Sequence, residues 1–202
     1  MIQNTRNERL KPRIVATIDK KGLYGSQGLN FIVATSNYNI YSFLGLLNSK
    51  LIDYLFSTKF LNLAIKADYL KKLKFPKSLA TNGIDNNAQD LSELNNSFSQ
   101  LVNKFISLFQ SKFEINKLTN KLKAWHDLDF GEFLKELEKA RKKSAKENAT
   151  EYTKLTLSEE AEWMQYFNEQ KQKAEELKTE IEKTDKEIDQ MVYELYGLTK
   201  EE

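Results

Sequence analysis

The last third of the chain carries an apolar stripe that constrains the fold more than any other feature. Its members recur in strict steps of four and three residues, the 3.5-residue repeat of a coiled-coil seam, with two polar interruptions. They are Trp163, Phe167, Gln170, Ala174, Leu177, Ile181, Thr184, Ile188, Met191 and Leu195. Thr156 and Glu159 have capping-box spacing before the stripe, and Gly197 with Leu198 fits a Schellman stop after it. We therefore expect one helix of about 40 residues, which needs a partner for its stripe.

A second apolar stripe supplies that partner within the same chain. Its members are Leu91, Leu94, Phe98, Leu101, Phe105 and Leu108. The pattern continues through Ile115 and Leu122 if Lys112 and Thr119 occupy stripe positions. Asp129 and Glu132 predict the capped start of a further helix, whose apolar residues are Phe130, Phe133, Leu134 and Leu137. Residues 142–153 are polar and predict a mobile connection, so residues 81–202 are expected to form a helical scaffold.

The first 80 residues have a different pattern, because both prolines and five of the seven glycines precede residue 84. Runs of β-branched and apolar residues predict strands over 13–18 and 29–35, with a tight turn over 19–22. Short strands are expected over 63–65 and 73–75, the latter ended by Pro76. Apolar residues at helical spacing predict a helix over 40–55, capped by Asn37 or Asn39. Residues 80–87 are a predicted linker. The predicted fold class is α+β: a small mixed α/β unit over 1–80, followed by a mainly α-helical region with long, paired, coiled-coil-like helices.

Charge is distributed unevenly between these two parts. Residues 1–80 contain 13 Lys and Arg against 4 Asp and Glu, a net +9, whereas the remainder contains 18 against 25, a net −7. A basic first part suggests that it alone contacts a polyanion such as DNA. The alternative is that Lys and Glu simply cover solvated faces. Cysteine is absent, and neither a signal peptide nor an apolar run of about 18 residues occurs, so we expect a soluble cytoplasmic protein without membrane partners.

The basic part also carries the residue types that read nucleic acids. Arg and Lys neutralise phosphates and contact guanine edges, whereas Gln and Asn pair with adenine. One group surrounds the first predicted strand and the turn after it: Arg6, Arg9, Lys11, Arg13, Lys20, Lys21, Tyr24, Ser26, Gln27 and Asn30. A second group comprises Lys66, Tyr69, Lys71, Lys72 and Lys74. These residues are the predicted DNA-binding surface.

Sequence signatures of catalysis are missing. The chain has no phosphate-binding loop, no dinucleotide fingerprint, and neither the glycine-rich turn nor the Asn-Pro-Pro-Tyr type motif of adenine methyltransferases. His126 is the only histidine and lacks sequence partners for a metal site. Glu176 and Lys178 match a Glu-x-Lys nuclease pair, but in a helix rich in both residues chance explains the match better. We expect the chain alone to be no enzyme and to hold no cofactor or metal.

Four segments resemble the C-terminal specificity region of type IIG restriction–modification enzymes and related adenine-specific DNA methyltransferases. They are RIVATIDKKGLYGSQGLNFIVA (13–34), YSFLGLLNSKLIDYLF (41–56), ADYLKKLKFPK (67–77) and EIDQMVYELYGLT (187–199). The resemblance spans nearly the whole chain and is strongest over 10–78 and 155–199. It implies that residues 1–80 are the later part of a target-recognition domain, with the helices aligning that domain on a catalytic core.

That family places a methyltransferase domain, sometimes with a nuclease, before this region. The resemblance therefore implies double-stranded DNA and a methyltransferase domain or subunit as partners, with S-adenosylmethionine and Mg²⁺ as cofactors in those catalytic parts. The methyltransferase motifs and the start of the recognition domain are missing from this sequence, which suggests a fragment or a separately encoded subunit. Two alternatives remain: a piece of a type I specificity subunit, which would carry two recognition domains, and a structural coiled-coil adaptor.

Overall fold

A computed structural model of the protein describes residues 1–7, 9–22, 25, 27–33, 39–60, 64–80 and 83–199. The chain divides into two compact units: unit 1 comprises Met1–Ser92 with Glu182–Glu202, and unit 2 comprises Glu93–Ile181. The described part is mostly helical with one small antiparallel sheet, so the fold class is α+β. The division differs from the predicted boundary at residue 80, because the end of the last helix packs into the core of unit 1 through Ile188 and Val192.

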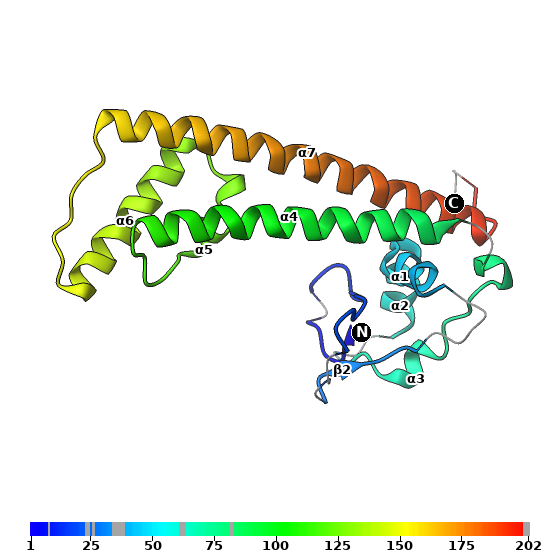
Figure 1. Ribbon diagram of the computed structural model, residues 1–202. Coiled ribbons are helices and arrows are strands. Elements are labelled where there is room, and N and C mark those ends of the chain that lie inside the picture. Colours follow the sequence, from blue (N-terminus) through cyan, green and yellow to red (C-terminus); the bar gives the residue numbers. More distant parts are fainter. Residues whose placement is uncertain are drawn as a thin grey trace. The chain divides into compact units, whose positions relative to one another are not determined.

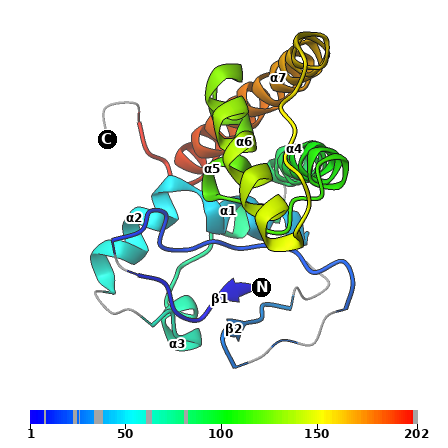
Figure 2. The same ribbon diagram turned by 90° about the vertical axis from the view of Figure 1, so that its left-hand side faces the viewer.

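The sheet of unit 1 is smaller than the sequence predicts. Strand β1 (Ile2–Gln3) pairs antiparallel with β2 (Leu29–Asn30), so the expected strand over 29–35 covers only its first two residues (Figure 2). The strand predicted over 13–18 is reduced to a single bridge from Ala16 to Ile2, and the one over 63–65 to a bridge from Ala64 to Thr5. Residues 34, 35 and 63 lie outside the described part. Residues 73–75 form no strand; the helical turn α3 (Ala67–Leu70) precedes them.

Side chains replace the missing strand pairing in unit 1. The Asn48 amide donates to the Ala16 carbonyl at 3.1 Å, and its oxygen accepts from the Ala16 N–H at 2.7 Å. The Asn30 amide donates to the carbonyl of Ile65 at 2.5 Å. Each of these amides satisfies main-chain groups that a longer ladder would otherwise pair. A strand pattern read from β-branched residues is therefore wrong here, since the extended backbone is held by asparagines.

Two helices occupy the region predicted as one over 40–55. Helix α1 (Ile40–Asn48) begins after Asn39, whose side chain accepts from the Tyr41 N–H at 3.0 Å, so this cap is confirmed; Asn37 lies outside the described residues. Ser49 has extended backbone and separates α1 from helix α2 (Lys50–Lys59), which follows immediately. The Ser49 hydroxyl accepts from the Ile52 N–H and donates to the Leu46 carbonyl, which fixes the break.

A close helix crossing forms the core of unit 1. Helix α4 (Ile84–Lys112) starts inside the predicted linker, after Gly83 and a 3-10 turn over Lys77–Ala80. A Cβ built on Gly45 would lie 2.7 Å from Cγ2 of Ile84 and 3.2 Å from Cβ of Ala88. Glycine therefore lets α1 approach this part of α4. The buried core of unit 1 includes Leu46, Leu47, Ile52, Phe56, Ile65, Leu79, Ile84, Ala88, Ile188 and Val192.

Unit 2 is built around an aromatic cluster. It combines the later part of α4 with the short helix α5 (Asn120–Lys123), a 3-10 turn over Trp125–Asp127, α6 (Phe130–Asn148) and the earlier part of α7 (Leu157–Leu195; Figure 1). The Phe105 ring lies 4.2 Å from the Trp125 ring and 5.6 Å from the Phe133 ring, centroid to centroid. Trp125 is fully buried and its indole N–H donates to the Val102 carbonyl at 3.3 Å. The buried indole donor of Trp125 is thus paired.

The helix signals of the second half are largely confirmed. Asp129 and Glu132 form the capping box of α6, and Glu159 accepts from the Thr156 N–H at 2.8 Å before α7. Helix α7 has 39 residues, and every member of its predicted stripe is buried or half-buried. Gly197 ends the helix with φ 71°, and the Leu198 N–H donates to the Tyr193 carbonyl at 2.9 Å. This is the predicted Schellman stop.

Two predictions for α4 are wrong. Helix α4 does not continue through Ile115 and Leu122; it ends at Lys112, and the Ile115 N–H closes on the Gln110 carbonyl while Glu114 takes φ 48°. Leu108 of α4 was predicted to lie in the stripe but is exposed, and Phe109 is buried in the core instead. The helix follows a 3.6-residue period, so the strict steps of three and four do not hold this far along it.

The predicted connection over 142–153 is partly helical, since α6 extends to Asn148. Its polar residues are accommodated because the small side chains of Ala140 and Ser144 occupy the buried face. Within the described part of the chain, no helix is both long and apolar enough to cross a bilayer.

Candidate nucleic-acid interface

Two stacked rings lie at the centre of the second predicted basic group, in unit 1. Phe60 follows the last residue of α2 and Tyr69 lies on α3. Their rings stack with centroids 4.5 Å apart and planes inclined by 12°. Phe60 is 8% exposed and also packs on Phe56, whose ring centroid lies 5.0 Å away. Tyr69 is half-buried at the edge of the same core. The inner ring is therefore fixed by the core and supports the outer ring.

Three lysines surround this pair of rings. The ammonium groups of Lys66 and Lys72 each lie 5.9 Å from the Tyr69 ring centroid, and that of Lys59 lies 5.9 Å from the Phe60 centroid. All three side chains are exposed. Among the described residues none of the three forms an ion pair, whereas Lys71 pairs with Asp68 at 3.5 Å. We refer to Lys59, Phe60, Lys66, Tyr69 and Lys72 as the lysine–aromatic cluster.

The N-terminal segment adds Lys11 to the neighbourhood of this cluster. Its ammonium donates to the Ser57 hydroxyl at 3.3 Å, in the same helical turn of α2 that carries Lys59. The segment is held there by the Thr5 bridge to Ala64 and by the Ile65 N–H, which donates to the Asn4 carbonyl at 2.7 Å. Arg6 is half-buried and its Nε donates to the Pro12 carbonyl at 2.7 Å. Lys11 of the first predicted basic group is thus held against α2, the helix that carries Lys59.

Some predicted contact residues have structural roles instead. Arg13 is only 3% exposed. Its guanidinium donates to the Arg6 carbonyl at 2.5 Å, and its main-chain N–H donates to the Asp53 carboxylate. The Asn30 amide nitrogen is occupied by Ile65. Gln27 is exposed, and its main-chain carbonyl accepts a hydrogen bond from the Asn4 amide. Arg9 and Lys74 are exposed; Tyr24 and Ser26 lie outside the described residues.

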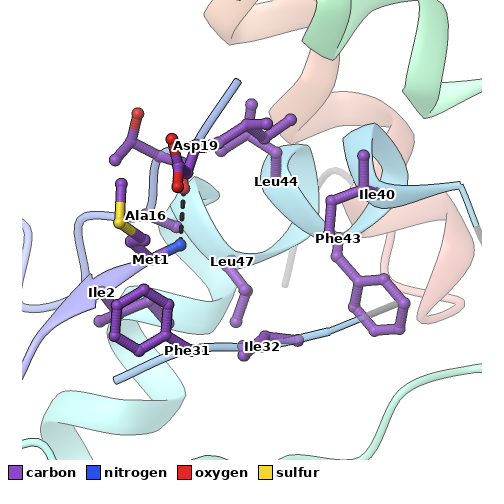
Figure 3. Close-up of a pocket in the computed structure, with 12 residues that line it drawn as sticks. Met1, Ile2, Ala16, Asp19, Phe31, Ile32, Ile40, Phe43, Leu44 and Leu47 are labelled. Carbon is purple, nitrogen blue, oxygen red and sulfur yellow. Dashed lines mark hydrogen bonds between the residues drawn. The ribbon is translucent and has the colours of Figure 1, made fainter. Parts of the chain in front are cut away.

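Lys20 and Lys21 occupy a different part of unit 1. Their turn is held by the Lys21 N–H, which donates to Asp19 at 2.8 Å, and the Lys20 ammonium lies 5.6 Å from the ring centroid of Tyr41 at the start of α1. A pocket of about 140 Å³ adjoins this turn. Figure 3 shows Phe31 and Ile32 on one side of it and Leu44 of α1 on the other. Lys20 thus contacts α1, whereas Lys11 contacts α2.

Sequence reasoning missed Lys59 and the anchoring of the chain's end. Lys59 carried a usable signal, because it directly precedes an aromatic residue shortly after the helix predicted over 40–55. The Lys50 ammonium lies 2.8 Å from Oδ2 of the buried Asp189, and this contact raises the Lys50 pKa. The Tyr196 hydroxyl donates to the Lys74 carbonyl at 2.7 Å, and burial raises the Tyr196 pKa. The end of α7 thus holds the main chain at Lys74, a member of the second predicted basic group.

One small network of titratable groups in unit 2 joins His126, Asp127 and Lys178. Asp127 lies between the Lys178 ammonium at 2.5 Å and Nδ1 of His126 at 3.0 Å. Burial lowers the pKa of His126, and nearby Lys178 lowers it further. The hydrogen bond from Lys178 lowers the pKa of Asp127. Within the described ranges no three His, Asp or Glu side chains are placed to hold a metal ion.

Comparison with known protein families gives a match over the second part of the chain. Residues 77–192 match a family described as a domain of unknown function, DUF8810. No curated protein and no solved structure matches the chain. The matched range covers α4 to α6 and most of α7, and it excludes the lysine–aromatic cluster. Because the match spans more than half of its residues, the chain belongs to the DUF8810 family of domains of unknown function.

Proposed function

We propose that unit 1 binds double-stranded DNA through the lysine–aromatic cluster and Lys11. The observation that supports this most is the set of three lysines that share two rings without a carboxylate partner among the described residues. Cation–π contacts position ammonium groups but leave their charge unneutralised. Like charges held together gain most from a polyanion that approaches them all, and a phosphodiester backbone is such a partner.

The wider role that we propose is sequence recognition within a DNA-modifying enzyme of the type IIG or adenine-methyltransferase class. In this proposal the chain supplies no catalytic group, and S-adenosylmethionine and Mg²⁺ act in a methyltransferase or nuclease part outside it. The helical region serves as a scaffold in which the apolar stripes of α4 and α7 pair. Gln27, with an exposed side chain on a fixed backbone, is the remaining candidate for reading a base edge.

Duplex titration at several salt concentrations tests the proposal. A labelled duplex is titrated with the wild-type chain, with Lys66→Glu/Lys72→Glu, and with Lys104→Glu/Lys173→Glu as the matched control. The control lysines are exposed mid-helix residues of unit 2. Lys171 is unsuitable because its ammonium donates to the Leu128 carbonyl.

We expect wild-type affinity to fall steeply with salt, since each neutralised phosphate releases about 0.9 counterion. Reversal at Lys66 and Lys72 should weaken binding to all duplexes and flatten the salt dependence, whereas the control should change little. If the control pair in unit 2 loses more DNA affinity than the Lys66 and Lys72 pair, the proposed DNA surface in unit 1 is wrong. Absence of binding by the wild type would favour the structural adaptor.

A further inference from the structure

We infer that a groove in unit 1 is the contact surface for a second copy of this chain, related to the first by a two-fold axis. The groove lies between α2 and the end of α7 and has a volume of about 820 Å³. This contact does not depend on DNA binding, because the groove is lined by other residues than the lysine–aromatic cluster. Its lining includes Leu51, Tyr54, Leu55, Gln190, Tyr193 and Leu198.

The walls of the groove are fixed by contacts within unit 1. The Lys50 N–H donates to Oδ1 of Asp189 at 2.8 Å, and the Lys50 ammonium lies 2.8 Å from Oδ2 of the same carboxylate. Asp189 is buried, so these two contacts hold the start of α2 against α7. Leu198 is held by its N–H, which donates to the Tyr193 carbonyl. A partner therefore meets a groove that is already formed, which lowers the entropic cost of binding.

Two of the lining residues also project from the surface. Tyr54 is 64% exposed and Leu55 is 37% exposed, and both lie on α2. Tyrosine is enriched at the centres of protein interfaces, where its ring is removed from water. One patch thus carries both projecting apolar groups and a groove that can receive them. A two-fold contact requires such a patch, because the same surface meets itself.

The charges on α7 beside the groove favour a second copy over a different partner. Lys186, Gln190 and Glu194 are spaced four residues apart, so they follow one side of the helix. Gln190 lines the groove and its amide donates to the Glu194 carboxylate at 2.9 Å. Lys186 and Glu194 are exposed, and in the part of the chain that the structure describes neither forms an ion pair. About 12 Å of helix separates them, which is too far for them to pair with each other.

An antiparallel second copy pairs both of these charges. With the two-fold axis passing at Gln190, Lys186 of each copy lies opposite Glu194 of the other. Tyr54 and Leu55 of each copy then face the groove of the other copy. Every contact occurs twice in such a dimer. A different protein would have to bring matching charges of its own, whereas a second copy supplies them by symmetry.

Sedimentation velocity of the full chain without DNA tests the dimer at protein concentrations up to about 100 µM. We expect a species with twice the 23.6 kDa mass of one chain. Tyr54→Ala removes the projecting ring and should raise the dissociation constant of the dimer about thirtyfold. Leu157→Ala, at an exposed apolar residue of unit 2, is the control and should leave it unchanged. Circular dichroism melting reports the folding of each variant.

A charge reversal and its rescue test the antiparallel arrangement. Lys186→Glu places like charges opposite each other twice in the dimer and should raise the dissociation constant about tenfold. Lys186→Glu/Glu194→Lys restores opposite charges across the axis and should return the dissociation constant to nearly the wild-type value. Lys173→Glu, at an exposed residue of α7 in unit 2, is the matched control and should have little effect.

Three results would overturn the dimer. A wild-type chain that stays monomeric over the whole concentration range would leave the groove to another protein or to a small ligand. A dimer that Tyr54→Ala does not weaken would use a different surface. A double reversal that dimerises no better than Lys186→Glu would exclude the antiparallel pairing. If Tyr54→Ala unfolds, the charge series decides, because both of its residues are exposed.

Discussion

Units 1 and 2 achieve order by different means. Unit 2 buries aromatic side chains between helices, with Phe105 in ring contact with Trp125, Phe133 and Phe167. Among its described residues unit 1 has two short strands, and side-chain amides and carboxylates hold other parts of its backbone, as at Asn48 and Asp53. Hydrogen bonds from such side chains hold the loop backbone of unit 1 in place. The second arrangement is the one that suits a binding surface.

The largest expected effect comes from a substitution that removes the ring at the centre of unit 2. Phe105→Ala should cost about 3–5 kcal/mol in the free energy of unfolding, because Phe105 is 1% exposed and its loss leaves a cavity among rings. Both tryptophans lie in unit 2, so tryptophan fluorescence during denaturation follows this unit. Leu157→Ala, at a residue 86% exposed, is the control and should change stability by less than about 0.5 kcal/mol. Similar stability of the two variants would contradict a core centred on Phe105.

The corresponding change in unit 1 removes two hydrogen bonds between a side chain and the main chain. Asn48→Ala leaves both the N–H and the carbonyl of Ala16 without their side-chain partner and should cost about 1–3 kcal/mol. Gln172→Ala breaks an exposed side-chain hydrogen bond to Glu176 on α7 and should have almost no effect. Chemical denaturation followed by far-UV circular dichroism measures both. If Asn48→Ala is as stable as the wild type, side-chain amides do not hold unit 1 together.

A pair of glycines distinguishes close packing from helix propensity. Gly45→Ala should destabilise unit 1 by about 1–2 kcal/mol, because the crowding of Ile84 and Ala88 outweighs the gain in helix propensity. At Gly131, the nearest atom to an added Cβ is Oδ1 of Asp129 at 3.3 Å, a polar tip rather than a packed core. Gly131→Ala should therefore be neutral or stabilising. Thermal melts of the two variants give the comparison, and stabilisation by Gly45→Ala would refute the close crossing.

The smallest effect concerns pH and belongs to unit 2. Burial lowers the pKa of His126, so in the window between its folded pKa and the unfolded value near 6.5 only the unfolded state binds the proton. Stability of unit 2 should therefore fall as the pH drops below about 6.5, and His126→Gln should abolish this dependence. The lowered pKa of Asp127 acts only at lower pH, through the loss of its contact with Lys178. Denaturation followed by tryptophan fluorescence from pH 7.5 to 5 measures the slope, and an unchanged slope in the variant would exclude His126.

The difference between the units also explains which features could be predicted from the sequence. The helices of the second half follow local rules: the capping residues Thr156 and Asp129 and the glycine stop at Gly197 all act within a few residues. The sheet of unit 1 depends on Asn48 reaching back to Ala16 and on β1, for which residues 2 and 3 give no pattern. Such contacts span tens of residues and leave no periodicity in the sequence.

The candidate surface could be predicted only in composition. Lys66, Lys71 and Lys72 were identifiable as basic residues near Tyr69, but the stack on Phe60 and the arrival of Lys11 at Ser57 depend on how α2 and the N-terminal segment meet. Charge counting likewise gave Arg13 the same weight as exposed residues, although Arg13 is buried. Composition identifies residue types, and packing decides which of them face a ligand.

Hydrogen exchange with and without DNA tests most directly whether unit 1 alone holds nucleic acid. The wild-type chain is exchanged free and saturated with a duplex at low salt, and protection is mapped by peptide. We expect new protection in peptides covering residues 57–74 and in the N-terminal segment that carries Lys11, with unit 2 unchanged. New protection concentrated in α6 or in the part of α7 before residue 182, with none over residues 57–74, would contradict the account.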